Sequence, residues 1–171
     1  MLEESERLVG ASPAEFHLPR FRELPDMGLY LEQVVRYVAR YSPNPLTASM
    51  VSNYVKQKTV PGPVKKAYGR ESIAYLIFVS YVKTVASMED ARFLMDIQRE
   101  SYTLEVAYDY FCSEFENLLQ FVYGLKEQPD SVGGAETPEK KLLRTALLSI
   151  AYQIYLDDNI RFLRRTQSEQ V

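Results

Sequence analysis

Two prolines separated by one residue, in the run Ser42-Pro43-Asn44-Pro45, most constrain how this chain of 171 residues can fold. A proline ring fixes φ and removes a backbone donor, and it pushes the preceding residue away from helical conformation. A helix predicted over residues 27–41, with Asp26 as its cap, must therefore end here. The next helix can begin only after the turn, with Thr47 as its expected N-cap. The pattern predicts a helix-turn-helix.

The helix after this turn carries small and polar side chains along one side and Val51, Tyr54 and Val55 on the other. Helical spacing places the polar residues on one exposed stripe. The stripe comprises Ser49, Ser52, Asn53 and Lys56. Asparagine can pair with adenine, and lysine can reach guanine or a phosphate. Two interpretations stay open at this point: a DNA-reading surface, and the ordinary solvated face of an amphipathic helix.

A basic, proline-stiffened segment follows, and it favours the first interpretation. Residues 44–70 contain five basic and no acidic side chains, although the whole chain has a net charge of −3. Residues 60–70 predict a short extended excursion with Lys65 and Lys66 near its tip and Tyr68 at its close. Such a hairpin after a recognition helix is a wing, whose lysines contact phosphate without reading sequence.

The segment from Leu46 to Pro61, the basic wing and the Ser87-Met88-Glu89-Asp90 helix start resemble the winged-helix head of mercury-resistance-type (MerR) regulators. The sequence is more similar to a bacterial family of uncharacterised domain proteins that are predicted transcriptional regulators. The shared residues are Leu18-Pro19-Arg20, Glu23-Leu24-Pro25-Asp26, Met50-Val51-Ser52-Asn53-Tyr54-Val55-Lys56 and Tyr68. The resemblance covers most of residues 18–100.

The resemblance implies a DNA-binding surface that includes the stripe, the exit of its helix and the wing. Its residues are Thr47, Ser49, Ser52, Asn53, Lys56, Lys58, Lys65, Lys66 and Tyr68. Ser49 and Ser52 stand where basic residues are usual in the mercury-resistance type, and Lys58-Thr59 replaces the usual Gly-Leu exit. We therefore expect one copy to bind weakly and specificity to depend on a second copy.

The segments beside this head are expected to form its supports. Residues 1–17 are expected to be a flexible arm, with one or two helical turns starting at Ser12, and Phe21 and Leu24 attach the next residues to the body. Gly69 is the expected cap of a helix over residues 70–84, which is apolar nearly all round and therefore central. Ser87 is the expected cap of the helix that follows.

The C-terminal half has heptad-like spacing over about three heptads, and a loop over residues 128–138 separates it from a second helix starting near Thr137. The stripe assigned to a dimer interface comprises Leu104, Tyr108, Phe111, Phe115, Leu118 and Val122. The alternatives are an antiparallel pair within one chain and an aromatic pocket for a small-molecule effector. The second helix carries a further apolar stripe, Leu143, Leu147, Ile150 and Ile154, whose register is expected to break at Asp157-Asp158.

Other chemistry finds little support in the sequence. Cys112, the only cysteine, is expected to be a buried core thiol, and His17, the only histidine, lacks partners for a metal site. The adjacent acids Asp157-Asp158 and the Glu114/Glu116 pair are expected on solvated helix faces rather than as catalytic pairs. No signal peptide or membrane-spanning run is visible, so we expect a cytoplasmic protein. No nucleotide loop, metal cluster or catalytic triad is visible either, so we expect no enzymatic activity and no cofactor or metal.

Together these features predict an all-α protein with a small β-wing. Residues 18–100 would form a winged helix-turn-helix domain and residues 101–171 a helical dimerisation region. The expected function is a sequence-specific transcriptional regulator that binds double-stranded DNA as a homodimer. Two alternatives remain: a protein-interaction module of winged-helix shape that does not bind DNA, and a regulator with a small-molecule pocket in the C-terminal helices.

Overall fold

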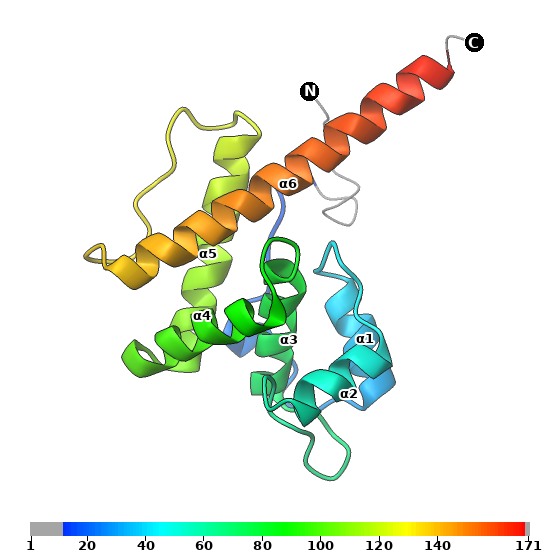
Figure 1. Cartoon of the computed structure of the whole chain (residues 1–171), viewed down its shortest axis with the longest axis vertical. Coiled ribbons are helices and arrows are strands. Elements are labelled where there is room, and N and C mark those ends of the chain that lie inside the picture. The colour runs from blue at the N-terminus through cyan, green and yellow to red at the C-terminus, as the bar shows by residue number, and fades with distance from the viewer. Residues whose placement is uncertain (1–11, 170–171) are drawn as a thin grey trace.

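The computed structural model describes residues 12–169, and its elements are helices (Figure 1). They are the short 3-10 helix η2 (Phe21–Glu23), α1 (Leu31–Ala39), α2 (Ala48–Lys56), α3 (Arg70–Val82), α4 (Met88–Ser101), α5 (Leu104–Val122) and α6 (Pro138–Ser168). The predicted all-α class is confirmed. No helix of this part of the chain has the length and apolar character to cross a bilayer.

The predicted β-wing is corrected, because residues 12–169 contain no strand. The segment between α2 and α3 makes only two isolated antiparallel bridges, Leu29 with Tyr68 and Val64 with Ala67. Pro61 and Pro63 lack the backbone donors that a longer ladder would need. The segment is therefore a minimal hairpin rather than part of a sheet.

Most helix starts lie where side-chain caps were expected. Thr47 Oγ1 accepts from the Met50 backbone N–H at 3.1 Å, and Ser87 Oγ accepts from that of Asp90 at 3.0 Å. Thr137 Oγ1 likewise accepts from the Lys140 N–H at 3.3 Å. Each cap satisfies a donor that the first helical turn leaves without a partner.

The start of α1 is a correction, because the helix was predicted from residue 27. Gly28 has φ +72°, and a Cβ there would lie 3.0 Å from the Ala67 Cβ. The Leu29 backbone exchanges hydrogen bonds of 2.9 and 2.8 Å with Tyr68. The chain is therefore held extended beside the hairpin until Tyr30, which is the N-cap instead of Asp26.

Helix α3 is the centre of the molecule, as its sequence predicted. All of its residues from Ser72 to Val82 are buried, and Gly69 is its N-cap. It packs against α1, α4, α5 and α6. One buried cluster runs from Phe16 to Ile154 and includes residues on both sides of the predicted domain boundary at residue 100. The helix-turn-helix and the C-terminal helices therefore share a core.

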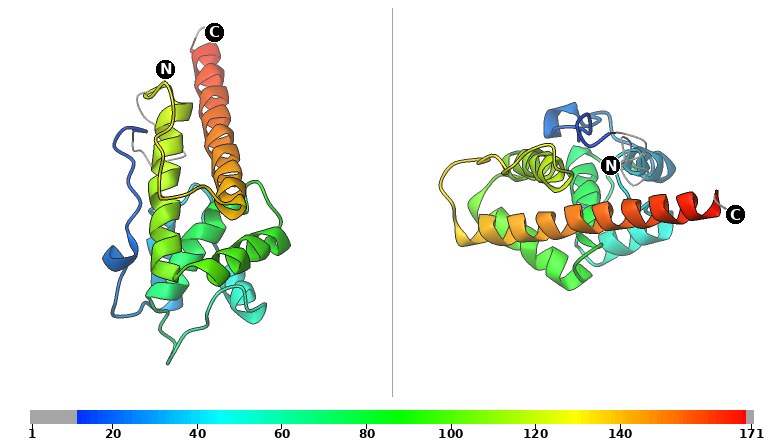
Figure 2. Two further views of the ribbon diagram at one scale, coloured as in Figure 1. Left: turned by 90° about the vertical axis from the view of Figure 1, so that its left-hand side faces the viewer. Right: turned by 90° about the horizontal axis from the view of Figure 1, so that it is seen from above.

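The apolar stripe of α5 is used inside the chain, which corrects its assignment as a dimer interface. Tyr108, Phe111, Phe115 and Leu118 are each at most 3% exposed, while Leu104 and Val122 are half-buried. The printed ring contacts of the stripe are with other segments of the same chain: Phe78 of α3 meets Phe111, and Phe16 meets Phe115. Helix α6 also packs along α5. Helix α6 crosses α5 obliquely and does not form an antiparallel pair with it, because the segment over residues 123–137 carries the chain back (Figures 1 and 2).

Helix α6 continues through Asp157 and Asp158, where a break in register was expected. Asp158 is buried and accepts a hydrogen bond of 2.5 Å from the Tyr123 hydroxyl. The last turns of α6 extend past the other helices, at the opposite end of the molecule from the hairpin (Figures 1 and 2). This projecting part exposes Leu156 and Leu163, which are 52% and 58% accessible.

The Glu114/Glu116 pair also departs from the expected solvated face. The Glu114 side chain is fully buried, with Arg144 Nε 3.0 Å from its Oε1. Glu116 accepts from Arg20 Nη1 and Nη2 at 2.8 and 2.9 Å and from the Leu18 backbone N–H at 2.8 Å. A buried carboxylate requires such partners, and here they join distant segments of the chain.

The N-terminal segment is packed where the structure describes it. Ser12 begins a single turn, within the one or two turns predicted, and its Oγ accepts from the Glu15 N–H at 3.3 Å. Phe16 meets the Phe115 ring at 6.0 Å, and Leu18 and Leu24 are fully buried, as expected for Leu24. The flexible arm predicted over residues 1–17 is thus corrected for its last part, and its first eleven residues lie outside the described chain.

Candidate nucleic-acid interface

Helix α2 presents its polar stripe outward, as predicted. Ser49, Ser52, Asn53 and Lys56 are exposed, and none makes a side-chain hydrogen bond or ion pair within residues 12–169. On the opposite side Val51 is fully buried and Tyr54 is 5% exposed. Burial raises the pKa of the Tyr54 hydroxyl. One face of α2 is thus fixed to the core and the other is available to a partner.

The turn before α2 is tied to the central helix. The Asn44 side-chain amide donates to the Ser80 backbone carbonyl at 3.1 Å and to Thr84 Oγ1 at 2.6 Å. Ser42 is 4% exposed, and its Oγ closes the turn by accepting from the Asn44 N–H at 3.1 Å. The two prolines end α1, and Asn44 then fixes the direction in which α2 leaves.

The exit of α2 is anchored by residues from α3 and α4. Arg92 Nη2 donates to the Gln57 carbonyl at 2.5 Å and to Thr59 Oγ1 at 2.8 Å. Ser72 Oγ donates to the Pro61 carbonyl at 2.8 Å. Sequence reasoning missed the role of Arg92, because its contacts are more than thirty positions away along the chain. No local pattern around Arg92 indicates that it reaches back to α2.

The tip of the hairpin is a two-residue turn between Val64 and Ala67, whose backbones exchange two hydrogen bonds of 2.9 Å. Its central residues, Lys65 and Lys66, have φ of +49° and +67° and are exposed. Positive φ at both positions defines a type I′ turn, which favours asparagine and glycine. Both side chains that were predicted to contact phosphate therefore stand at the tip.

Lys58, at the end of α2, also adopts the left-handed conformation, with φ +57°. The Thr59 N–H reaches back to the Tyr54 carbonyl at 2.9 Å, which ends the helix in the manner usual for a glycine. Lys58, Lys65 and Lys66 are the only non-glycine residues with positive φ between residues 12 and 169. All three were predicted site residues, and all three are exposed.

The charges on this face are mostly unopposed. Lys56, Lys58, Lys65 and Lys66 have no carboxylate within ion-pair distance among the described residues. Arg70 is used differently, because its Nε donates to the Leu24 carbonyl at 3.2 Å. One acidic residue stands nearby, since Glu89 lines a shallow depression with Gln57 and Arg92. The lysines thus form a positive edge around the exposed side of α2.

Two other predicted residues have structural positions. Tyr68 is 5% exposed, and its backbone pairs with Leu29. Burial raises the pKa of the Tyr68 hydroxyl. Its assignment to the DNA-binding surface is therefore corrected: Tyr68 is a core residue that holds the base of the hairpin. Thr47 is exposed, but its hydroxyl is engaged as the N-cap of α2.

Reactive chemistry does not gather at this face. Cys112 is buried in the core as predicted, and burial raises the pKa of its thiol to about 12. His17 lies between carboxylates, with Nδ1 3.3 Å from Glu116 Oε1. Across residues 12–169, no three histidine, cysteine or acidic side chains are placed to hold a metal ion.

The fold and this face define a helical protein built on a helix-turn-helix, with a basic hairpin between the second helix and a buried third helix. The chain belongs to the family described as "Domain of unknown function (DUF1836)", whose model matches residues 19–111. The match includes α1 to α4 and the first part of α5, so it contains the whole candidate interface. The predicted membership of an uncharacterised family is confirmed. No curated protein and no solved structure matches the chain.

Proposed function

We propose that this protein is a DNA-binding transcriptional regulator that inserts α2 into the major groove. The observation that carries the proposal is the exposed stripe of α2 bordered by Lys58, Lys65 and Lys66. A B-DNA major groove admits one α-helix, and short side chains near the start of α2 let its backbone approach the base edges. Asn53 is the proposed reader of adenine, and Lys56 reaches guanine or phosphate.

The backbone conformations of the three lysines support this assignment. A non-glycine residue in the left-handed region costs roughly 1–2 kcal/mol, and glycine would avoid this cost. Strained backbone conformations cluster at functional sites, where the function of the side chain keeps it in place despite the strain. Two lysines at the tip of the hairpin are placed to contact phosphates beside the groove. They would position α2 without reading sequence.

The order of elements provides a further argument. A helix, a turn, an exposed second helix, a basic hairpin and a buried third helix follow one another as in the winged-helix head of mercury-resistance-type regulators, which the sequence resembles. The hairpin here is shorter than a β-wing, so each copy has few phosphate contacts. Two copies bound to adjacent half-sites, about one DNA turn or roughly 34 Å apart, would supply the affinity that one copy lacks.

The second copy needs a surface, and α5 no longer offers one. We assign the contact to the projecting part of α6, where Tyr152, Leu156, Ile160 and Leu163 are between 38% and 58% exposed. Their spacing of four, four and three residues keeps them on one side of the helix. Exposed apolar side chains at helical spacing are typical of a helix–helix contact between chains. The hairpin lies at the other end of the molecule, so both surfaces are free at once (Figure 1).

The competing function is a protein-interaction module that has this shape and does not bind DNA. Ser49 and Ser52, in place of basic residues, and the acidic remainder of the chain favour it. The two functions differ in their response to salt. A regulator that uses four to six lysine contacts per dimer loses DNA affinity with a log–log slope of about −4 to −5 against salt concentration. An interaction module shows no salt-sensitive DNA binding.

The experiment measures affinity for random duplex DNA and for fragments selected from genomic DNA, over a range of salt concentrations. Asn53→Ala should weaken binding to the selected site much more than to random DNA, whereas Lys65→Ala should weaken both similarly. Lys141→Ala, an exposed lysine on α6, is the matched control and should change neither. Absence of salt-sensitive binding at low ionic strength would reject the proposal, and equal effects of the first two variants would reject Asn53 as a base reader.

A further inference from the structure

The projecting part of α6 carries an apolar stripe that the rest of the described chain leaves exposed. Its members are between 38% and 58% accessible, and they are Tyr152, Leu156, Ile160 and Leu163. At 3.6 residues per turn, these four positions fall within roughly 80° of the helix circumference. The stripe is therefore narrow enough to be covered by one further helix.

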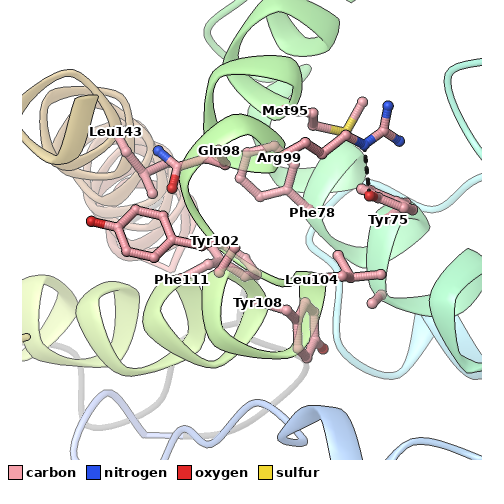
Figure 3. A pocket seen from close by; sticks show the side chains of 12 residues that line it. Tyr75, Phe78, Met95, Gln98, Arg99, Tyr102, Leu104, Tyr108, Phe111 and Leu143 are labelled. Carbon is pink, nitrogen blue, oxygen red and sulfur yellow. Dashed lines mark hydrogen bonds between the residues drawn. The ribbon is translucent and has the colours of Figure 1, made fainter.

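The opposite side of α6 is engaged inside the chain. Its apolar members are each at most 2% exposed, and they are Leu143, Leu147, Ile150 and Ile154. Leu143 lines a small hollow where α6 meets α3, α4 and α5 (Figure 3). Helical periodicity places these four residues about half a turn away from the stripe. The body of the molecule thus covers one side of α6 and leaves the stripe to a partner.

Two charged residues beside the stripe indicate which partner fits. Asp157 and Arg164 are seven residues apart, so both lie on the same flank of α6. The Asp157 carboxylate accepts from Gln153 Nε2 at 3.0 Å, and Arg164 is exposed and forms no ion pair within residues 12–169. When two identical helices pair antiparallel, equivalent flanks face each other. Such a pair brings Asp157 of one copy against Arg164 of the other.

The apolar and the charged positions share one centre of symmetry. The midpoint between Leu156 and Leu163 and the midpoint between Asp157 and Arg164 both fall within half a residue of Ile160. A two-fold axis at Ile160 therefore matches the leucines with each other and the opposite charges with each other at the same time. In a parallel pair, Asp157 and Arg164 would stay roughly 10 Å apart along the helix axis.

We propose that the second copy docks through its own α6, antiparallel to the first, about a two-fold axis at Ile160. This inference rests on the proposed function, since it specifies how the two DNA-binding copies are joined. A contact of four apolar side chains per copy is small beside the roughly 1,200 Å² that stable interfaces bury, so the dimer is weak and reversible. Two half-sites on one DNA strengthen it, because the first bound copy raises the local concentration of the second.

Cysteine cross-linking on the full chain tests the orientation. A disulfide needs two Cα atoms within about 7 Å of each other, so Ile160→Cys should cross-link with itself under mild oxidation. Leu156→Cys and Leu163→Cys should cross-link only when the two variants are mixed. Each lies roughly 10 Å along the axis from its own equivalent in an antiparallel pair. The unsubstituted protein is the control and should not cross-link, because Cys112 is buried.

Exchange of the two charges tests the flank contact in solution. Arg164→Asp should weaken the dimer about tenfold in sedimentation equilibrium, because it sets like charges opposite each other on both sides of the axis. Adding Asp157→Arg to the same chain should restore the affinity to within about threefold of the original. Lys141→Asp, at an exposed position near the start of α6, is the matched control and should change nothing.

Three results would overturn the inference. They are no cross-link through Ile160→Cys, cross-linking of Leu156→Cys or Leu163→Cys with itself, and failure of the double variant to recover the affinity that Arg164→Asp loses. Neither test uses DNA, so its outcome is distinguishable from that of the proposed function. A protein that passes both tests without salt-sensitive DNA binding rejects only the proposed function. A protein that binds DNA and fails the cross-linking rejects only the antiparallel contact.

Discussion

The helix-turn-helix and the α5–α6 pair both carry amphipathic helices, but they use their patterns in opposite ways. In α2 the apolar side, Val51 and Tyr54, meets the core, and the polar stripe remains free. In α5 the apolar stripe that suggested a partner chain is covered inside the same chain, by rings of α3 and of the N-terminal segment. Helix α6 packs along α5 as well. Exposed apolar side chains at helical spacing occur instead on the last turns of α6, where the sequence pattern was weaker.

The difference shows what a hydrophobic stripe can establish. Its spacing fixes which side of a helix must be covered, because leaving it in water is unfavourable. Spacing contains no information on which chain provides the cover. For α5 the covering rings come from earlier, separate segments of the chain, such as Phe16 against Phe115 and Phe78 against Phe111. Only the folded arrangement distinguishes a partner within the chain from one outside it.

The largest expected effect tests whether the α5 stripe belongs to the core of the chain. Phe111 is 1% exposed and meets the rings of Phe78 and Tyr81 at 5.2 and 5.9 Å. Phe111→Ala should lower the free energy of unfolding by about 3–5 kcal/mol, the cost usual for a buried phenylalanine. Urea unfolding monitored by circular dichroism measures it. Because the two regions share one core, the whole chain should still unfold in a single transition, at a lower urea concentration than the unsubstituted protein.

If Phe111 instead lies between chains, Phe111→Ala would dissociate an oligomer, which light scattering would detect. The free energy of unfolding of the monomer would then be unchanged. The matched variant is Leu163→Ala on the projecting end of α6, at a side chain that is 58% exposed. It should change the monomer's stability by less than about 0.5 kcal/mol. Its effect should appear in the oligomeric state instead.

The parts of the fold that the sequence predicted correctly depend on neighbours along the chain. The helix starts at Thr47, Ser87 and Thr137 follow from local caps, and the turn before α2 follows from two prolines. The start of α1 was wrong, because the Leu29–Tyr68 pairing that holds it extended joins residues far apart in the sequence. Side-chain pattern could not reveal a constraint made by backbone atoms.

The candidate site shows the same division. Exposure of Ser49, Ser52, Asn53 and Lys56 followed from helical periodicity and was confirmed. Burial of Tyr68 was missed, because a tyrosine after a basic hairpin fits both a groove contact and a core position. Arg92 was missed for a different reason. Its partners, Gln57 and Thr59 at the exit of α2, come to lie beside α4 only when the chain folds.

An intermediate effect concerns how charge joins α5 to α6. Burial of Glu114 raises the pKa of its carboxyl, an effect that the neighbouring Arg144 partly opposes. A raised pKa in the folded state favours the protonated form. Its contribution to stability is therefore complete below the ordinary value of 4.5 and is lost as pH rises through the folded-state value.

Glu114→Gln should accordingly flatten the pH dependence of the free energy of unfolding above pH 4.5. Thermal or urea unfolding at three pH values measures the slope. Glu100→Gln, at an exposed position on α4, is the control and should leave the slope unchanged. A steeper slope in the Glu114 variant would contradict the assignment.

The smallest expected effect has the opposite sign and concerns the hairpin. Lys66 has φ +67°, a conformation that glycine adopts without the steric cost of a Cβ. Lys66→Gly should raise the free energy of unfolding by about 0.5–1 kcal/mol, the relief of strain exceeding the entropy gained by the unfolded chain. The same substitution removes one phosphate contact per copy. It should reduce the steepness of the log–log salt slope for DNA by about 0.9 per copy.

Lys66→Ala separates the two consequences, because it removes the charge and keeps the Cβ. It should lose DNA affinity to the same extent as Lys66→Gly and gain no stability. If Lys66→Gly stabilises the protein and leaves DNA affinity unchanged, Lys66 has no role in DNA binding. That result would favour the alternative of a protein-interaction module. If both variants lose affinity and only the glycine variant gains stability, Lys66 sacrifices stability of the fold for contact with a partner. Truncating a residue on the buried face of α5 should never raise the free energy of unfolding, because a smaller side chain there always removes packing from the core.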